Sequence, residues 1–108
     1  MKTQARDSVV QLGKFSIDRF RFEVKVEETE IKLSRKEFDL LWTLASDEGR
    51  AFRRQELIER VWGNGCFIDT RTVDVHIARL RTKLKEASAK APSIETVWGI
   101  GYRLRTSA

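Results

Sequence analysis

The chain has 108 residues, of which 41% are hydrophobic and 34% charged, so we expect one globular domain and not a disordered or fibrous segment. Its 21 Lys and Arg against 16 Asp and Glu give a net charge of +5, which mildly favours a polyanionic partner. The sequence lacks an apolar run of the roughly 20 residues that a membrane span needs. Its single cysteine, Cys66, excludes an intrachain disulfide and a cysteine-cluster zinc site. We therefore expect a cytoplasmic domain without a membrane segment, metal or cofactor.

The N-terminal third of the sequence predicts a small antiparallel sheet. Residues 1–8 are polar and patternless, and we expect a lead-in or linker remnant there. From position 20 the pattern has period two, which is typical of a strand with one buried face. Its hydrophobic members are Phe20, Phe22, Val24 and Val26. We expect an acidic turn at 27–30, a resumed alternation over 31–33, and short strands at 9–12 and 15–17.

The pattern changes to helical spacing at Ser34. Ser34 followed by Glu37 fits a capping box, in which each side chain satisfies a free backbone N–H of the other residue. The helix is expected to end near Gly49 and to bury Phe38, Leu41, Leu44 and Ala45. A second helix is predicted over 54–62. It would bury Leu57, Ile58 and Val61 and be ended by Gly63 and Gly65.

A third helix is predicted over 70–84, with Asp69 or Thr70 as its cap. It carries one narrow apolar stripe, formed by Val73, Ile77, Leu80 and Leu84. At 100° per residue the opposite face consists of Arg71, Val75, Ala78, Arg79 and Thr82. One flank of that face carries Thr72, His76 and Lys83.

The C-terminal segment predicts a hairpin. Two strands, 94–97 and 102–105, are joined by Gly99-Ile100-Gly101, and residues 106–108 are expected to be a tail. We expect both glycines to supply backbone angles that residues with a Cβ resist. A nucleotide-binding loop is excluded, because no third glycine and no helix follow.

The polar face of the third helix has two interpretations. It is either a solvated helix face or a recognition helix, whose dimensions fit the DNA major groove. The short helix and turn before it and the glycine-tipped basic hairpin after it favour a helix-turn-helix with a wing. Catalysis is not expected, because His76, Cys66 and Asp69 lack both metal-ligand spacing and an orienting third group.

Four segments in succession resemble the OmpR/PhoB family of winged-helix DNA-binding domains from bacterial response regulators. They are LSRKEFDLLWTLA, ELIERVWG, DTRTVDVHIARLRTKL and ETVWGIGYRL, and the resemblance covers about residues 9–105. It implies an α+β winged helix-turn-helix, with an N-terminal four-stranded antiparallel sheet, three helices and a C-terminal β-hairpin wing. It also implies sequence-specific binding of double-stranded DNA by the effector domain of a two-component, phosphorelay-controlled transcription factor.

The resemblance implies DNA contacts for six residues: Arg71, Thr72, His76, Arg79, Arg81 and Trp62. For the other residues, a role is expected from the residue type and its place in the predicted elements. Base contacts are expected from Arg79, Val75 and Thr72, although Thr72 equally fits a phosphate contact and Arg79 a solvated position. Contacts with the sugar-phosphate backbone of DNA are expected from Arg71, His76, Arg81, Lys83, Trp62, Thr96, Tyr102 and Arg103. For Arg81 an intramolecular salt bridge is the alternative, and for Trp62 it is packing. The wing tip would consist of Trp98, Gly99 and Gly101.

Partners follow from the resemblance as well. The domain is expected to bind as a head-to-tail dimer on direct-repeat promoter sites about one helical turn apart, with a receiver domain on a missing N-terminal segment of a full-length chain. RNA polymerase is a further expected partner. It would contact the loop formed by Gly63, Asn64, Gly65, Cys66, Phe67 and Ile68.

Two residues depart from the family pattern. Arg53 stands where relatives commonly have a serine N-cap, and Trp98 stands where many carry an arginine that enters the minor groove. Two alternatives to the response-regulator interpretation stay open. The domain could serve as a winged-helix protein-interaction module, or as the cytoplasmic DNA-binding domain of a membrane-anchored regulator.

Overall fold

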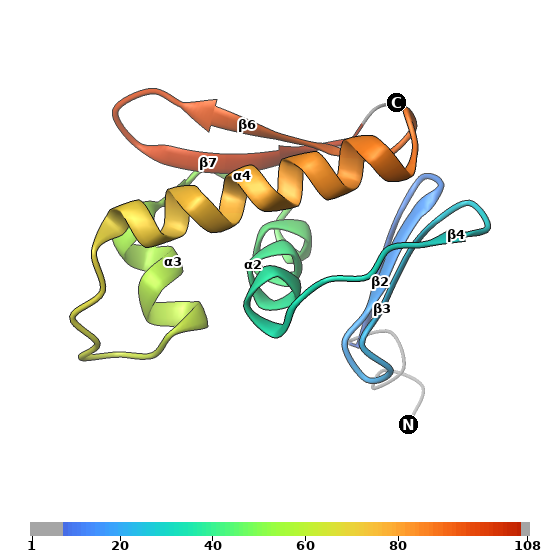
Figure 1. Ribbon diagram of the computed structural model, residues 1–108. Coiled ribbons are helices and arrows are strands. Elements are labelled where there is room, and N and C mark those ends of the chain that lie inside the picture. Colours follow the sequence, from blue (N-terminus) through green and yellow to red (C-terminus); the bar gives the residue numbers. More distant parts are fainter. Residues whose placement is uncertain (1–7, 107–108) are drawn as a thin grey trace.

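The structure is a computed structural model that describes residues 8–106. The expected lead-in, 1–8, and tail, 106–108, therefore lie outside the described residues except for Ser8 and Thr106. Within 8–106 the chain forms a four-stranded antiparallel sheet, three helices and a three-stranded antiparallel sheet, as the sequence predicts apart from one strand (Figure 1).

The N-terminal sheet has the order β1-β2-β3-β4. Its strands are β1 (Val9–Leu12), β2 (Phe15–Asp18), β3 (Glu23–Val26) and β4 (Thr29–Glu30). The turn expected over 27–30 was wrong in its second half, because residues 29 and 30 form β4. Thr29 already pairs with Val26, so β4 precedes the segment 31–33 that we expected to form the fourth strand.

The expectation that Phe20 and Phe22 lie in a strand was also wrong. The carboxylate of Asp18 accepts hydrogen bonds from the N–H groups of Phe20 and Arg21, at 2.9 and 3.1 Å, and so holds residues 19–22 in a turn. Phe22 has a φ of +53° there. Both rings are exposed, Phe20 at 80% and Phe22 at 53%.

Three helices follow: α2 (Arg35–Ser46), α3 (Arg54–Val61) and α4 (Thr70–Ala87). The capping box at the start of α2 is confirmed, because Ser34 accepts a bond from Glu37 N–H while the Glu37 carboxylate accepts one from Ser34 N–H. Asp69 caps α4, and this helix continues three residues beyond the predicted Leu84. The N-cap residue of α3, Arg53, makes no side-chain capping bond.

The C-terminal sheet has the order β5-β7-β6. The hairpin strands are β6 (Ser93–Val97) and β7 (Gly101–Arg105), and the unpredicted strand is β5 (Phe52–Arg53). This strand explains Gly101, for which the prediction of a special backbone angle was wrong. A Cβ at Gly101 would collide with the backbone carbonyl of Phe52, so glycine is needed for close approach of the strands.

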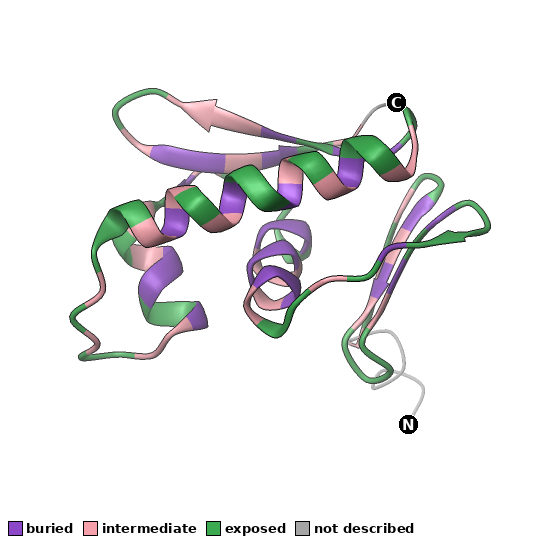
Figure 2. Ribbon diagram, in the orientation of Figure 1, coloured by how far each residue is buried: buried purple, intermediate pink, exposed green. Residues whose placement is uncertain are grey.

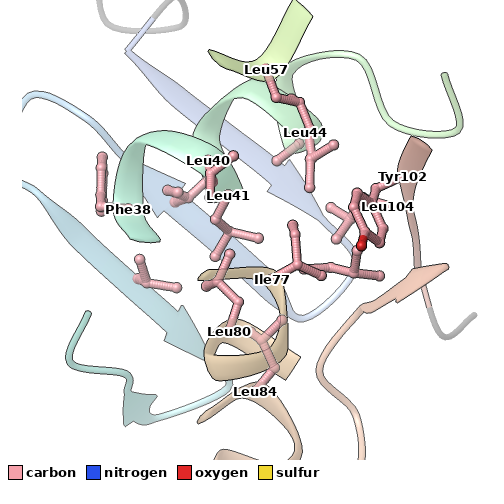
Figure 3. Close-up of a cluster of buried hydrophobic side chains, with 14 of the residues drawn as sticks. Phe38, Leu40, Leu41, Leu44, Leu57, Ile77, Leu80, Leu84, Tyr102 and Leu104 are labelled. Atoms are coloured by element: carbon pink, nitrogen blue, oxygen red, sulfur yellow. The ribbon is translucent and has the colours of Figure 1, made fainter. Parts of the chain in front are cut away.

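The buried side chains of both sheets and all three helices form one core. α4 runs across α2 and α3 with the hairpin behind it, and its buried positions alternate with exposed ones (Figure 2). Leu41 and Leu44 of α2, Ile77 and Leu80 of α4 and Leu104 of β7 are fully buried in this cluster (Figure 3). Each such side chain contributes about 1.5–3 kcal/mol of transfer free energy to folding.

Candidate nucleic-acid interface

α4 separates an apolar face from a polar one. The side chains of the predicted apolar stripe are each at most 2% exposed: Val73, Ile77, Leu80 and Leu84. On the opposite side Arg79 is exposed and Val75 is 47% exposed. Among residues 8–106 nothing forms a hydrogen bond or ion pair with Arg79. Its guanidinium keeps all five donors for an external acceptor.

The start of α4 holds Arg71 on the surface. The Asp69 carboxylate accepts a bond from Arg71 N–H at 2.9 Å and pairs with the Arg71 guanidinium at 2.9 Å. These contacts lower the pKa of Asp69 and raise that of Arg71, chiefly through the side-chain hydrogen bond. The Arg71 side chain remains 85% exposed and stays charged at every physiological pH.

Trp62 and His76, which we expect to contact the DNA backbone, lie next to each other in the structure. Their rings meet edge to face, with centroids 5.2 Å apart. The nitrogen Nδ1 of His76 lies 2.8 Å from the Thr72 carbonyl and must carry the proton in that bond, because a carbonyl only accepts. Lys36 joins this group, since its Nζ donates to Val61 O and lies 5.7 Å from the Trp62 ring.

Two residues of α4 that we expected to contact the DNA backbone form bonds with other parts of the domain. Lys83 Nζ lies 2.6 Å from the buried carboxylate of Glu37. Arg81 donates to Ile94 O at 2.9 Å and to Thr96 Oγ1 at 2.8 Å, so it fastens α4 to β6. Arg81 thus makes intramolecular hydrogen bonds, and among the described residues it lacks the salt bridge that was the alternative.

Asp74 links α3, α4 and the hairpin. One of its carboxylate oxygens accepts from Tyr102 Oη at 2.6 Å and from Arg54 Nε at 2.7 Å. Burial acts to raise the pKa of Asp74, but these two hydrogen bonds hold it below its ordinary value. Burial and the bond to Asp74 raise the pKa of Tyr102. Tyr102 is 5% exposed, which places its ring in the core.

The hairpin ends in an aromatic side chain on a tight turn. Ile100 N–H donates to Val97 O at 2.9 Å, and Gly99 has a φ of +81°, as the third residue of a type II turn requires. Trp98 is 88% exposed. Further down the hairpin, Arg103 Nε pairs with Glu95 across the strands at 2.9 Å.

The loop between α3 and α4 presents one exposed ring. Phe67 is fully exposed, whereas Cys66 Sγ donates to Trp62 O at 3.2 Å and Ile68 packs against the core. The described residues contain no cluster of three or more His, Cys, Asp or Glu suited to a metal ion. No helix within 8–106 is long and apolar enough to cross a membrane.

The residues predicted to contact DNA or to form the wing tip thus divide into two groups. Those that are accessible from outside are Arg71, Thr72, Val75, His76, Arg79, Trp62, Trp98 and Gly99. Those engaged within the fold are Arg81, Lys83, Thr96, Tyr102 and Arg103, together with Gly101. Three further residues belong to the site and are not indicated by any sequence pattern, because their partners lie on other elements: Lys36, Arg54 and Asp74.

Known proteins resemble this chain over most of its length. Residues 28–104 match the family described as transcriptional regulatory protein, C terminal. The chain is 44% identical over 100 residues to the sensory transduction protein RegX3 of Mycolicibacterium smegmatis, covering 93% of this chain and 44% of RegX3. It is 45% identical over 84 residues to the response regulator SaeR of Staphylococcus aureus, covering 78% of this chain and 37% of SaeR. The chain therefore spans less than half the length of these curated relatives.

A solved structure resembles the fold closely. It is the DNA-binding domain of Klebsiella pneumoniae RstA in complex with the RstA box, with 33% sequence identity and a TM-score of 0.77. The match covers 90% of this chain and 96% of the RstA domain. The two domains thus share their fold over the matched part of the chain.

Proposed function

This chain belongs to the family of transcriptional regulatory protein C-terminal domains, and from that premise we propose that it binds double-stranded DNA in a sequence-specific manner. It acts as the effector domain of a response-regulator transcription factor. α4 enters the major groove, and the hairpin lies as a wing on the adjacent minor groove or backbone.

The observation that carries this proposal is the exposed face of α4. Arg79 stands in the middle of the helix, uncompensated by any acidic residue of the described chain, and opposite the buried stripe. A guanidinium so placed suits a bidentate hydrogen bond to guanine, and Val75, one turn earlier, suits contact with a thymine methyl group. Thr72 lies one further turn toward the start of the helix, on the same side.

Phosphate contacts surround this base-reading face. Arg71 and His76 lie on the first two turns of α4, Trp62 ends α3, and Lys36 stands beside the Trp62 ring. Such contacts fix the register of the protein on the duplex without reading sequence. The engaged residues, among them Arg81, Lys83 and Tyr102, serve the interface mainly by holding α4 and the wing in place.

The rest of the protein is inferred from the relatives. RegX3 and SaeR are more than twice as long as this chain, so a receiver domain in a longer protein fits the family. The proposed assembly is a head-to-tail dimer on direct repeats in the cytoplasm. Phe67, exposed on the loop 63–68, offers an apolar contact for RNA polymerase.

A salt titration tests the proposal against the rival function of a protein-interaction module. A polyanion releases counterions when basic residues bind its phosphates, so log K should fall with log salt at about −0.9 per phosphate contact. The measurement is the anisotropy of a labelled 25-base-pair duplex drawn from a binding selection, between 50 and 300 mM KCl. A flat response, or no duplex recovered by the selection, would exclude DNA as the partner.

A further inference from the structure

We infer that Arg53 contacts a DNA phosphate beside the tip of the wing. An arginine at this position serves DNA binding at the expense of a cap for α3. The inference rests on the proposed function and adds to it a residue outside α4 and the hairpin. The three helices differ in how their starts are capped.

Arg53 occupies a position that normally stabilises a helix. At the starts of α2 and α4, Ser34 and Asp69 accept hydrogen bonds from backbone N–H groups of the first turn. Arg53 is the N-cap of α3, with extended backbone angles, and makes no such bond. A guanidinium has donors only and therefore cannot cap a helix start.

The charge of Arg53 is also uncompensated within the described chain. Almost every Lys and Arg of residues 8–106 has a hydrogen bond, an ion pair or an aromatic ring as partner. The four without one are Lys25, Arg53, Arg79 and Lys85. The next residue, Arg54, illustrates the contrast, because it pairs with Asp74 at 2.7 Å. Arg53 and Arg79 are thus the two arginines left for an external anion.

The C-terminal sheet places Arg53 beside the wing tip. Arg53 pairs with Gly101, and Gly101 pairs with Val97, so one row crosses the sheet and ends at the residue before Trp98. Phe52 is fully buried, and neighbouring residues of a strand point to opposite faces, so Arg53 faces solvent. Its charge lies on the edge strand of the wing sheet.

The spacing along this row fits a groove edge. Two strand spacings of roughly 4.8 Å separate Arg53 from Val97, about 10 Å in all. The minor groove is about 6 Å wide. A wing tip that lies over the groove therefore leaves Arg53 beside the phosphates of one strand, where a flexible arginine reaches them.

Arg53→Ser separates a binding role from a folding role. Serine restores a cap, so the thermal midpoint should rise, while DNA affinity should fall about five- to tenfold at 0.1 M salt and the salt slope should shrink by about 0.9. Arg53→Gln should lose the same affinity without the rise in midpoint. Lys25→Gln is the matched control, because it removes one unpaired charge from the N-terminal sheet, and its salt slope should stay that of the wild type.

The probe is a mixed-sequence 25-base-pair duplex, because phosphate contacts do not depend on sequence. The inference is overturned if Arg53→Ser leaves the salt slope unchanged, or lowers affinity no more than Lys25→Gln does. A fall in both midpoint and affinity would also contradict it, since that is the result of a purely structural role. Failure of the wild-type chain to bind the duplex would instead remove the proposed function itself.

Discussion

Glu37 is the one buried charged side chain among residues 8–106, at 2% exposure. It closes the capping box of α2 and also pairs with Lys83 of α4. Burial acts to raise its pKa, but the hydrogen bonds from Lys83 and from Ser34 N–H, with the charge of Lys83, hold that pKa below the ordinary value of 4.5. A carboxylate whose pKa is lowered by folding stabilises the folded state only while it is ionised.

The stability that Glu37 contributes should therefore depend on pH. It is fully present above pH 4.5, the unfolded value, and is lost as the pH falls through the lower pKa of the folded state. Glu37→Gln keeps an acceptor for Ser34 N–H but loses the ion pair, which we expect to cost about 1 kcal/mol at pH 7, because the half-exposed Lys83 is screened by solvent. Urea unfolding from pH 7 to pH 3 measures this; the two proteins should converge in acid, and a constant difference would refute the assignment.

Trp98, unlike Glu37, is a large side chain exposed to solvent, and its contacts among the described residues show no role in folding. An indole cannot bring charge into a narrow minor groove as an arginine does. We expect Trp98→Arg to tighten binding to duplexes with A·T-rich flanks and to leave the thermal midpoint within a degree or two. Anisotropy with A·T-rich and G·C-rich flanks around one selected site measures the preference. An unchanged preference would make the wing tip a scaffold only.

At the scale of the element, the wing is fastened to the helices by two sets of bonds. Asp74 holds Tyr102 of β7 and Arg54 of α3, while Arg81 holds the backbone and the threonine of β6. Both guanidinium groups also lie 5.4 Å from the Tyr102 ring. The angle between the recognition helix and the wing is therefore set by side chains, not by the short hairpin alone.

Tyr102→Phe removes one of these bonds and keeps the buried ring. Because Asp74 retains Arg54, we expect a loss of only about 0.5–1.5 kcal/mol in stability. DNA affinity should fall more for flanking positions under the wing than for positions under α4. Chemical denaturation and binding to flank-substituted duplexes test this, with Phe52→Leu as a control for core packing. Equal losses at all positions would show that Asp74 does not orient the wing.

Local patterns predicted the helices well and the sheet edges poorly. Ser34 and Glu37 fix the start of α2 through bonds within one turn, and the apolar stripe of α4 reports its buried face directly. The prediction of a strand at Phe20 and Phe22 was wrong because Asp18 holds the backbone in a turn through hydrogen bonds. The alternation of hydrophobic residues contains no information about these bonds. β5 escaped notice because two residues carry no periodicity.

In the site, too, local features could be predicted and long-range pairings could not. Exposure of Arg79 follows from helical geometry and was predicted, whereas Lys83 pairs with a residue 46 positions earlier in the sequence. The pairing of Asp74 with residues 20 and 28 positions away depends likewise on the folded arrangement of three elements. One sequence read alone contains no signal for such partners.

At the scale of the whole molecule, the parts of the proposed interface gather at one end. The first turns of α4, α3 and the tip of the hairpin lie on the same side of the molecule, away from the N-terminal sheet (Figure 1). Arg53 and Arg79, the two arginines that lack a partner among residues 8–106, belong to this half of the domain. A duplex that meets this end contacts the recognition helix and the wing at once, which leaves the N-terminal sheet outside the interface.

The central claim is that Arg79 reads a base from the major groove. Its most direct test is the affinity of wild type, Arg79→Ala and Lys85→Ala for a selected duplex and for its single-base-pair variants. Lys85 is the other unpaired cation of α4, so Lys85→Ala controls for the loss of charge. We predict that Arg79→Ala loses about 1–3 kcal/mol of discrimination at one G·C pair, while Lys85→Ala, which removes a charge from the last turn of α4, leaves the discrimination between base pairs unchanged. Equal losses for Arg79→Ala on the selected and the random sequences would contradict the claim.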